Sequence, residues 1–233
     1  MSILEKLNDR QRKAAEKIEG ALLILAGAGS GKTRTITYRI AHMIQELGIS
    51  PYKILAVTFT NKAAKEMKER VEDLVGEDGR RTMVSTFHSF GVRLLRTYGD
   101  RLGYGANFTI YDADDQKRVV KGIMKELVVK DKNLTEGMVV SLISKLKEEE
   151  ISADEYEKSE NKYNMNAVVV AEIYRRYNIT LKNNNGMDFS DILINTAKLL
   201  EIPDILNKVQ DKFRYIMVDE YQDTNNIQYK IIN

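Results

Sequence analysis

A glycine-rich stretch near the N-terminus limits the folds that this 233-residue chain can adopt. The apolar run 21–25 precedes it and predicts a strand, and apolar residues at helical spacing follow it from Ile36 to Leu47. A strand, a glycine loop and a helix in this order form a phosphate-binding loop, because glycines let backbone N–H groups converge on one anion at a helix N-terminus. The loop consists of Ala26, Gly27, Ala28, Gly29, Ser30, Gly31, Lys32 and Thr33.

The last two residues of the loop have the chemistry to bind a nucleoside triphosphate. Lys32 provides a mobile positive charge for the β- and γ-phosphates, and the Thr33 hydroxyl is placed to ligate Mg²⁺. Ala26 departs from the strict pattern, which has glycine at that position. The loop nevertheless ends in the full Gly-Lys-Thr sequence, so we expect ATP and Mg²⁺ as cofactors.

A second motif supplies the partner that such a loop needs. The apolar strand 215–218 ends in Asp219 and Glu220, and Gln222 follows. We expect Asp219 to hold Mg²⁺ through its water shell and Glu220 to accept a proton from the water that attacks the γ-phosphate. Gln222 is placed to sense that phosphate. The predicted catalytic residues are Glu220, Gln222 and Lys32, and the predicted metal ligands are Thr33 and Asp219.

Two further strands end at the edge where open α/β sheets bind ligands. One runs from Ile54 into Phe59, Thr60 and Asn61. Phe59 either packs in the core or stacks on a base, and Thr60 or Asn61 caps the helix that follows. The other strand leads to His88 at a helix start. His88 either contacts a phosphodiester or only packs and caps there.

Beyond residue 111 the alternation of strands and helices stops. Helical patterns cover residues 114–129, 135–150, 165–184 and 188–201. They predict a helical insertion before the strand that carries Asp219. Phe189 begins the last of these helices after a polar turn, so it faces either the core or a ligand. Near the N-terminus Gln11 lies on a helix, where its amide either meets the edge of an adenine or is solvated.

Composition excludes several classes of protein. With 43% apolar and 30% charged residues the chain is typical of a globular domain, and it has no cysteine for a disulfide. It has no apolar run near the length of a membrane span and no secretory signal, so we expect a cytoplasmic protein without a membrane partner. Residues 1–101 carry 18 basic against 12 acidic side chains, an excess that is compatible with binding a polyanion.

At five places, in the same order, the chain resembles the UvrD/Rep/PcrA-like superfamily 1 DNA helicases. These places are Gln11, 26–34, 58–64, 85–89 and 219–223, and 188–191 resembles a DNA-contacting element in the family's helical insertion. The resemblance implies single-stranded DNA and single/double-strand junctions as partners. It assigns DNA contacts to Phe59, Thr60, Asn61, His88 and Phe189. It assigns nucleotide contacts to Gln11, Arg34 and the glycine loop.

The resemblance also implies a fold and a domain organisation. Residues 1–111 and 203–233 are expected to form a P-loop NTPase domain of the RecA-like α/β type, a parallel sheet with helices on both faces. Residues 112–202 are expected to form an all-helical inserted subdomain. The family continues with a second RecA-like domain that supplies arginine fingers, and this missing domain is an expected partner. We interpret the chain as the N-terminal motor domain of an ATP-dependent DNA helicase, with a role in DNA repair. ATP hydrolysis would drive single-strand translocation and duplex unwinding in the full-length protein.

Two other classes of function are compatible with the loop. A P-loop kinase would transfer phosphate to a small molecule, but it needs neither Glu220 beside the metal aspartate nor an aromatic rim. Alternatively, the isolated chain is a non-catalytic module that binds nucleotide or DNA. Phosphate release that single-stranded DNA stimulates would indicate a motor. Phosphate transfer to a small acceptor would indicate a kinase, and binding of nucleotide or DNA without phosphate release would indicate a binding module.

Overall fold

The computed structural model describes residues 2–27, 29–131, 133–159 and 165–233, which divide into two compact units. Unit 1 contains the chain up to Phe90 together with Pro203–Thr224. Unit 2 contains Gly91–Ile202 and Asn225–Asn233. The sequence pattern placed a boundary after residue 111 instead, so the domain limits stated above stay a prediction.

Unit 1 is built on a three-stranded parallel sheet with the order β2-β1-β5. The strands are β1 (Ile54–Thr58), β2 (Met83–Thr86) and β5 (Tyr215–Val218). All five residues of β1 are buried, as expected for a central strand that has neighbours on both sides and is apolar throughout. All three strands were predicted, and the α/β class with a parallel sheet is confirmed.

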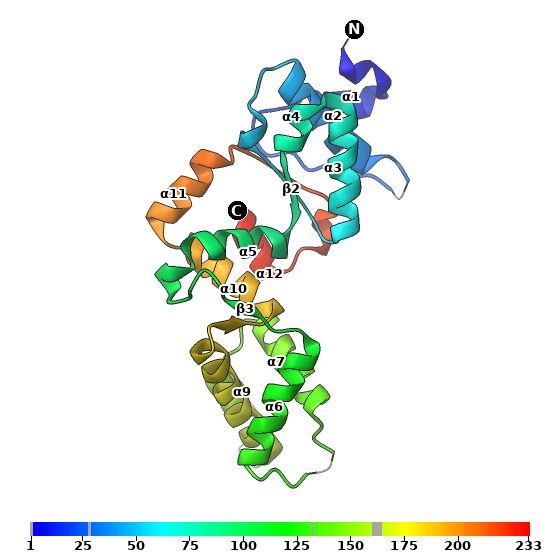
Figure 1. The fold of residues 1–233 in the computed structure, drawn as a ribbon. Helices are drawn as coiled ribbons and strands as arrows, with labels where there is room; N and C mark the ends of the chain where they lie inside the picture. The colour runs from blue at the N-terminus through cyan, green and yellow to red at the C-terminus, as the bar shows by residue number, and fades with distance from the viewer. Residues whose placement is uncertain (1, 28, 132, 160–164) are drawn as a thin grey trace. The chain divides into compact units, whose positions relative to one another are not determined.

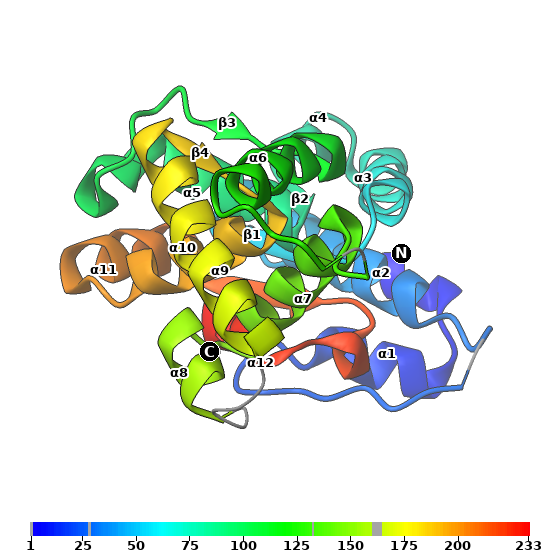
Figure 2. The ribbon, with the colours of Figure 1, turned by 90° about the horizontal axis from the view of Figure 1, so that it is seen from below.

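One face of this sheet is covered by α2 (Lys32–Gln45) and α3 (Asn61–Val75), which lie side by side in Figures 1 and 2. Ile40 and Met43 of α2 and Met67 of α3 are fully buried in one cluster with residues of β1. Burial of these apolar side chains places the N-terminus of α2 at the end of the sheet. The remaining elements of unit 1 are η1 (Ile3–Lys6), α1 (Asp9–Glu16), η2 (Pro51–Lys53), α4 (Glu77–Arg81), α11 (Pro203–Lys212) and η4 (Tyr221–Asp223).

The predicted strand 21–25 is wrong. This segment has no regular structure, and the exposed fractions of Leu22, Leu23 and Leu25 are 39%, 62% and 86%. An apolar run becomes a strand only when a sheet edge pairs with it, and that pairing is a tertiary effect that the local pattern does not contain. The glycine loop therefore follows an extended segment rather than a strand of the described sheet.

Unit 2 is mainly helical. Its principal core lies between α6 (Ala113–Glu126), α7 (Glu136–Glu148) and α9 (Met165–Asn183), which lie side by side in Figure 1. The four predicted helices of this region are confirmed to within a few residues, whereas α8 (Ala153–Ser159) was not predicted. The other elements are α5 (Phe87–Tyr98), which begins in unit 1, η3 (Gly99–Leu102), α10 (Phe189–Leu200) and α12 (Asn226–Ile232).

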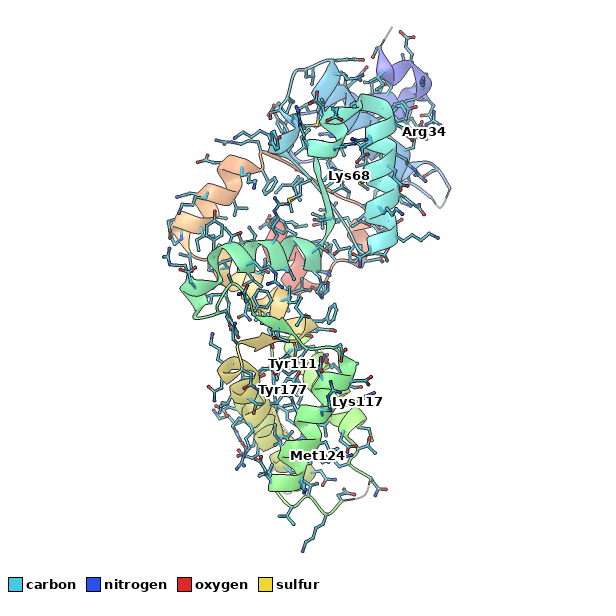
Figure 3. All side chains as sticks on the ribbon, viewed as in Figure 1. Arg34, Lys68, Tyr111, Lys117, Met124 and Tyr177 are labelled. Carbon is cyan, nitrogen blue, oxygen red and sulfur yellow. The ribbon has the colours of Figure 1, made fainter. Side chains whose placement is uncertain are left out.

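A short parallel pair of strands also lies in unit 2. It joins β3 (Thr109–Ile110) to β4 (Gly186–Met187). A Cβ on Gly186 would overlap the ring of Tyr111, so this close approach requires glycine. Tyr111 itself packs against the core that contains Tyr177, as Figure 3 shows. Throughout the parts of the chain that the structure describes, no helix combines the length and the apolar character of a membrane span.

Glu46 at the end of α2 holds the N-terminal residues of unit 1. Its carboxylate accepts hydrogen bonds from the Ile3 N–H (2.6 Å) and the Ser2 hydroxyl (2.9 Å), and it pairs with His42 Nδ1 (2.8 Å). Burial raises the pKa of Glu46, but the bonds from Ile3, Ser2 and His42 lower it, and the net pKa is below its usual value. The charged form is therefore the one that the folded state stabilises.

We expect Glu46→Gln to destabilise unit 1 at neutral pH and to matter less in acid. Because the folded-state pKa is lowered, the stabilisation is present above the unfolded-state pKa of about 4.3 and is lost as pH falls through the folded-state value. Urea unfolding at several pH values between neutrality and acid measures this difference. Glu19→Gln, at an exposed site, is the control. If the free energies of unfolding of Glu46→Gln and wild type differ by the same amount at every pH, the expectation is contradicted.

Candidate functional site

The glycine loop closes on itself before α2 begins. Ser30 donates from its N–H (3.3 Å) and its hydroxyl (2.6 Å) to the carbonyl of Gly27. Gly29 and Gly31 have φ values of 73° and 85°, a left-handed conformation that glycine adopts without strain. No side chain caps α2 at Gly31, so the N–H groups of its first turn are available to an anion. The predicted loop residue Ala28 lies outside the described residues.

Gln11 contacts this loop directly. Its Nε2 donates to the carbonyl of Ser30 (3.0 Å), and a Cβ on Gly31 would lie 2.8 Å from the same nitrogen. The Gln11 amide is oriented by Asn8, whose side chain accepts from the Gln11 N–H while Gln11 Oε1 accepts from the Asn8 N–H. The sequence favoured Asn8 or Asp9 as the helix cap, and Asn8 is the cap, but its reciprocal bond with Gln11 was not predicted, although Asn-x-x-Gln at a helix start is the spacing of a capping box.

Lys32 of the loop and Arg34 just after it point to different places. Lys32 Nζ donates to the carbonyl of Ala26 (3.3 Å), so the lysine lies back over its own loop. The Arg34 guanidinium donates to the carbonyl of Lys6 (2.9 Å) and lies 5.2 Å from the centroid of the Tyr38 ring. Figure 3 shows Arg34 on the outer part of unit 1. Lys32 thus lies over the loop that is predicted to bind phosphate, and the phosphate contact of Lys32 and the nucleotide contact of Arg34 both stay predictions.

The loop and the acidic motif meet at Thr33. Its hydroxyl donates to Asp219 Oδ2 at 3.0 Å, across 186 positions of sequence. Asp219 is only 5% exposed, and its N–H donates to the carbonyl of Val57 (2.9 Å), which extends the pairing of β5 with β1. A hydroxyl and a carboxylate side by side are oxygen donors of the type that Mg²⁺ prefers. The residues present therefore fit a magnesium ion held between the two motifs.

Glu220 has an unusual backbone. Its φ of 52° and ψ of 46° are left-handed, a conformation that costs a residue with a Cβ of the order of 1–2 kcal/mol. The turn directs the half-buried Glu220 carboxylate toward Gln222, whose Nε2 donates to Glu220 Oε2 (2.6 Å). The two predicted catalytic side chains that follow Asp219 therefore interact with each other.

The predicted DNA contacts of unit 1 lie together at one edge of its sheet. Thr58 of β1 and Thr86 of β2 are in register, so the residues that follow them are neighbours. The ring of half-buried Phe59 lies 5.6 Å from the ring of Phe87. Around it are Thr60, which caps α3 by accepting from the Ala63 N–H, exposed Asn61, and half-buried His88 on the first turn of α5.

Phe189 belongs to unit 2, and its surroundings are described within that unit. It is the first residue of α10, and its exposed fraction is 54%. Asp188 caps this helix and forms a reciprocal capping box with Asp191. Of the two interpretations of Phe189, a fully buried core position is excluded, and a DNA contact stays a prediction.

The comparisons with known proteins agree with one another. The family model described as "UvrD/REP helicase N-terminal domain" matches residues 7–233. Over 232 residues the chain is 46% identical to the "ATP-dependent DNA helicase PcrA" of Staphylococcus epidermidis and 45% identical to the protein of that name from Staphylococcus aureus. Each match covers 99% of this chain and 32% of the relative, so the chain spans about a third of the length of these relatives.

We expect Glu220→Gly to be more stable than Glu220→Ala by about 1 kcal/mol, because only glycine adopts the left-handed turn without a steric cost. Both variants lose the bond to Gln222, so their difference isolates the backbone. Gln210 in α11 is the control, where alanine should be the more stable by about 1 kcal/mol. Urea unfolding measures both differences. If alanine is the more stable variant at position 220 as well as at position 210, Glu220 does not keep this backbone conformation in solution.

Proposed function

The chain belongs to the UvrD/REP helicase family, and we propose that it is the motor domain of an ATP-dependent DNA helicase. In this proposal it binds Mg·ATP at the glycine loop and single-stranded DNA at the rim around Phe59. The observation that carries the proposal is the hydrogen bond between Thr33 and Asp219, because it joins the phosphate loop to the acidic motif that phosphoryl transfer requires.

In this site the phosphates of ATP are bound by the first turn of α2 and by Lys32. The uncapped N–H groups of α2 donate to phosphate oxygens, and Lys32 leaves the Ala26 carbonyl to reach the β- and γ-phosphates. Thr33 and Asp219 would hold Mg²⁺, which supplies positive charge to the oxygens of the β- and γ-phosphates. Gln11, held against Ser30 by its amide, defines the wall of the loop on the side of the nucleotide.

Glu220 is the proposed general base. Its carboxylate directly follows the metal aspartate, so a water molecule at the γ-phosphate comes within its reach. The 2.6 Å bond from Gln222 orients this carboxylate before nucleotide binds. Because Gln222 can also donate to a phosphate oxygen, loss of the γ-phosphate would change the position of both side chains. This is how the proposed site would sense hydrolysis.

The proposed DNA rim combines an aromatic face with polar groups. Phe59 is half-buried and is supported from behind by Phe87, so its ring is rigid enough to stack on a base. Exposed Thr60 and Asn61 and the half-buried His88 can donate hydrogen bonds to phosphate or sugar. The basic excess of the first 101 residues favours a polyanion.

Unwinding of a duplex is proposed for the longer protein rather than for this chain alone, since the relatives are about three times as long. Phosphate release with and without single-stranded DNA tests the assignment, in this chain and in a protein of the relatives' length. Release that DNA stimulates in the longer protein supports the motor. Nucleotide binding without release in both supports a binding module, and transfer to a small acceptor supports a kinase.

We expect Lys32→Ala to weaken Mg·ATP binding by about 10- to 150-fold, since a hydrogen bond to a charged group contributes about 1.5–3 kcal/mol. The variant should keep the wild-type fold, because the one side-chain hydrogen bond of Lys32 among the described residues is an exposed bond to the Ala26 carbonyl. Calorimetric titration with Mg·ATP measures the affinity. Lys65→Ala, at an exposed lysine of α3, is the control and should bind as wild type does. Equal affinity of Lys32→Ala and wild type would remove the nucleotide assignment.

We expect Phe59→Ala to weaken single-stranded DNA binding by about 1–3 kcal/mol at every salt concentration, because stacking is largely independent of salt. Lys62→Ala on the neighbouring turn should instead reduce the salt dependence by about one unit or less, because a lysine releases counterions from phosphate. Titration of labelled DNA at several salt concentrations separates the two. If Phe59→Ala binds as wild type does throughout, Phe59 is only a packing residue.

A further inference from the structure

A lysine is buried in unit 2. The side chain of Lys147 on α7 is only 3% exposed, and its Nζ lies 2.7 Å from Asp188 Oδ2 and 2.7 Å from Asp191 Oδ1. Asp188 Oδ2 also accepts from the Tyr177 hydroxyl (2.9 Å), and Lys147 Nζ lies 5.0 Å from the centroid of the Tyr177 ring. We call Lys147, Tyr177, Asp188 and Asp191 the lysine cluster.

Stability alone does not account for this cluster. Removing ions from water is costly, and replacing a buried ion pair by apolar residues of similar volume is often neutral or stabilising. Burial lowers the pKa of Lys147, but Asp191 and Asp188 raise it, and the net pKa is above its usual value. The lysine thus stays charged, although its neighbours Leu146 and Tyr177 belong to the apolar core of the unit. What such a cluster supplies is a defined geometry for the groups it joins.

The geometry that it defines is the start of α10. Asp188 Oδ1 accepts from the Asp191 N–H (2.8 Å), and Asp191 Oδ2 accepts from the Asp188 N–H (3.2 Å). The remaining oxygen of each carboxylate is bound by Lys147. Lys147 therefore binds both members of the capping box, Asp188 and Asp191. The Tyr177 hydroxyl on α9 donates a further hydrogen bond to Asp188.

Phe189 lies between these two anchored carboxylates in sequence. It is the first helical residue, directly after the cap, and its ring is 54% exposed although both neighbouring anchors are mostly buried. Any shift in the start of α10 would rotate this ring by about 100° for each residue, the turn of a 3.6-residue helix. The direction of the Phe189 ring thus depends on the same bonds that satisfy Lys147.

We infer that Lys147 and Tyr177 are positioning residues for Phe189: through the Asp188 and Asp191 cap they hold its ring in the orientation in which it stacks on a base of single-stranded DNA. For the stacking, the inference rests on the proposed DNA binding and on the DNA contact that the family resemblance assigns to Phe189. For the orientation, it rests on the lysine cluster. The two parts are tested separately.

A fluorescent reporter tests the orientation without DNA. The chain contains 12 tyrosines but no tryptophan, so Phe189→Trp introduces a single tryptophan at the helix start, which is excited selectively at wavelengths that tyrosine does not absorb. In that background, Lys147→Met and Tyr177→Phe are expected to lower the anisotropy of the emission and to increase its quenching by acrylamide. The matched controls should leave both unchanged. They are Tyr174→Phe, which removes a buried hydroxyl of α9 that bonds Ile151, and Lys145→Met, at an exposed lysine of α7.

Circular dichroism identifies a variant that fails to fold. If Lys147→Met unfolds unit 2, Tyr177→Phe alone tests the positioning role, because this variant removes one hydrogen bond and leaves the ion pairs of Lys147 in place. Unchanged anisotropy and quenching in folded Tyr177→Phe and Lys147→Met would overturn the positioning role. Equal changes in the control variants would overturn it as well, since the effect would then not be specific to the cluster.

DNA affinity tests the coupling to Phe189. With stacking at about 1–3 kcal/mol per base, Phe189→Ala should weaken binding of a labelled oligonucleotide by about 5- to 150-fold. Lys147→Met should weaken it in the wild-type and Phe59→Ala backgrounds, but not further in Phe189→Ala. An equal loss in all backgrounds would contradict positioning. If Phe189→Ala binds DNA as wild type does while the fluorescence responds to Tyr177→Phe, the DNA contact is wrong and the positioning role stands.

Discussion

The structure of unit 1 depends on the position of β1 between its two neighbours. Because β2 and β5 both pair with it in parallel, three strands end at the same edge of the sheet. Asp219 is carried to Thr33 by this pairing, and its own N–H extends the ladder by one bond to Val57. The proposed nucleotide site and the proposed DNA rim are thus consequences of one strand order, in which apolar burial supplies the stability and the polar strand ends supply the functional groups.

Much of this arrangement could be predicted from the sequence, because its signals are local. The glycine loop, the apolar runs of β1 and β5 and the acidic pair after β5 each have a recognisable pattern at a fixed spacing. The structure places Thr33 and Asp219 in contact, as expected if the glycine loop and the acidic motif after β5 bind the same metal ion. The helices of unit 2 were predicted equally well, since helical periodicity is also a local property.

What could not be predicted depends on contacts between distant residues. The run 21–25 has the composition of a strand but no partner in the described sheet, and the pattern of a single segment does not reveal its partners. Lys147 looks like any solvated lysine near the end of α7, and only the fold shows that two aspartates 41 and 44 positions away lie against it. The left-handed turn at Glu220 also has no local signature, because glycine is the residue expected there.

The contact between Gly31 and Gln11 has a consequence for sequence variation in this family. Any side chain at position 31 would need the space of the Gln11 amide, whose nitrogen would lie 2.8 Å from the new Cβ, and it would also have to adopt a φ of 85°. The two positions are therefore expected to covary: a relative that tolerates a larger residue at the first should carry a shorter one at the second. Loss of glycine in the loop would then be accompanied by loss of the amide that bonds the Ser30 carbonyl, so a single substitution would be selected against more strongly than the pair.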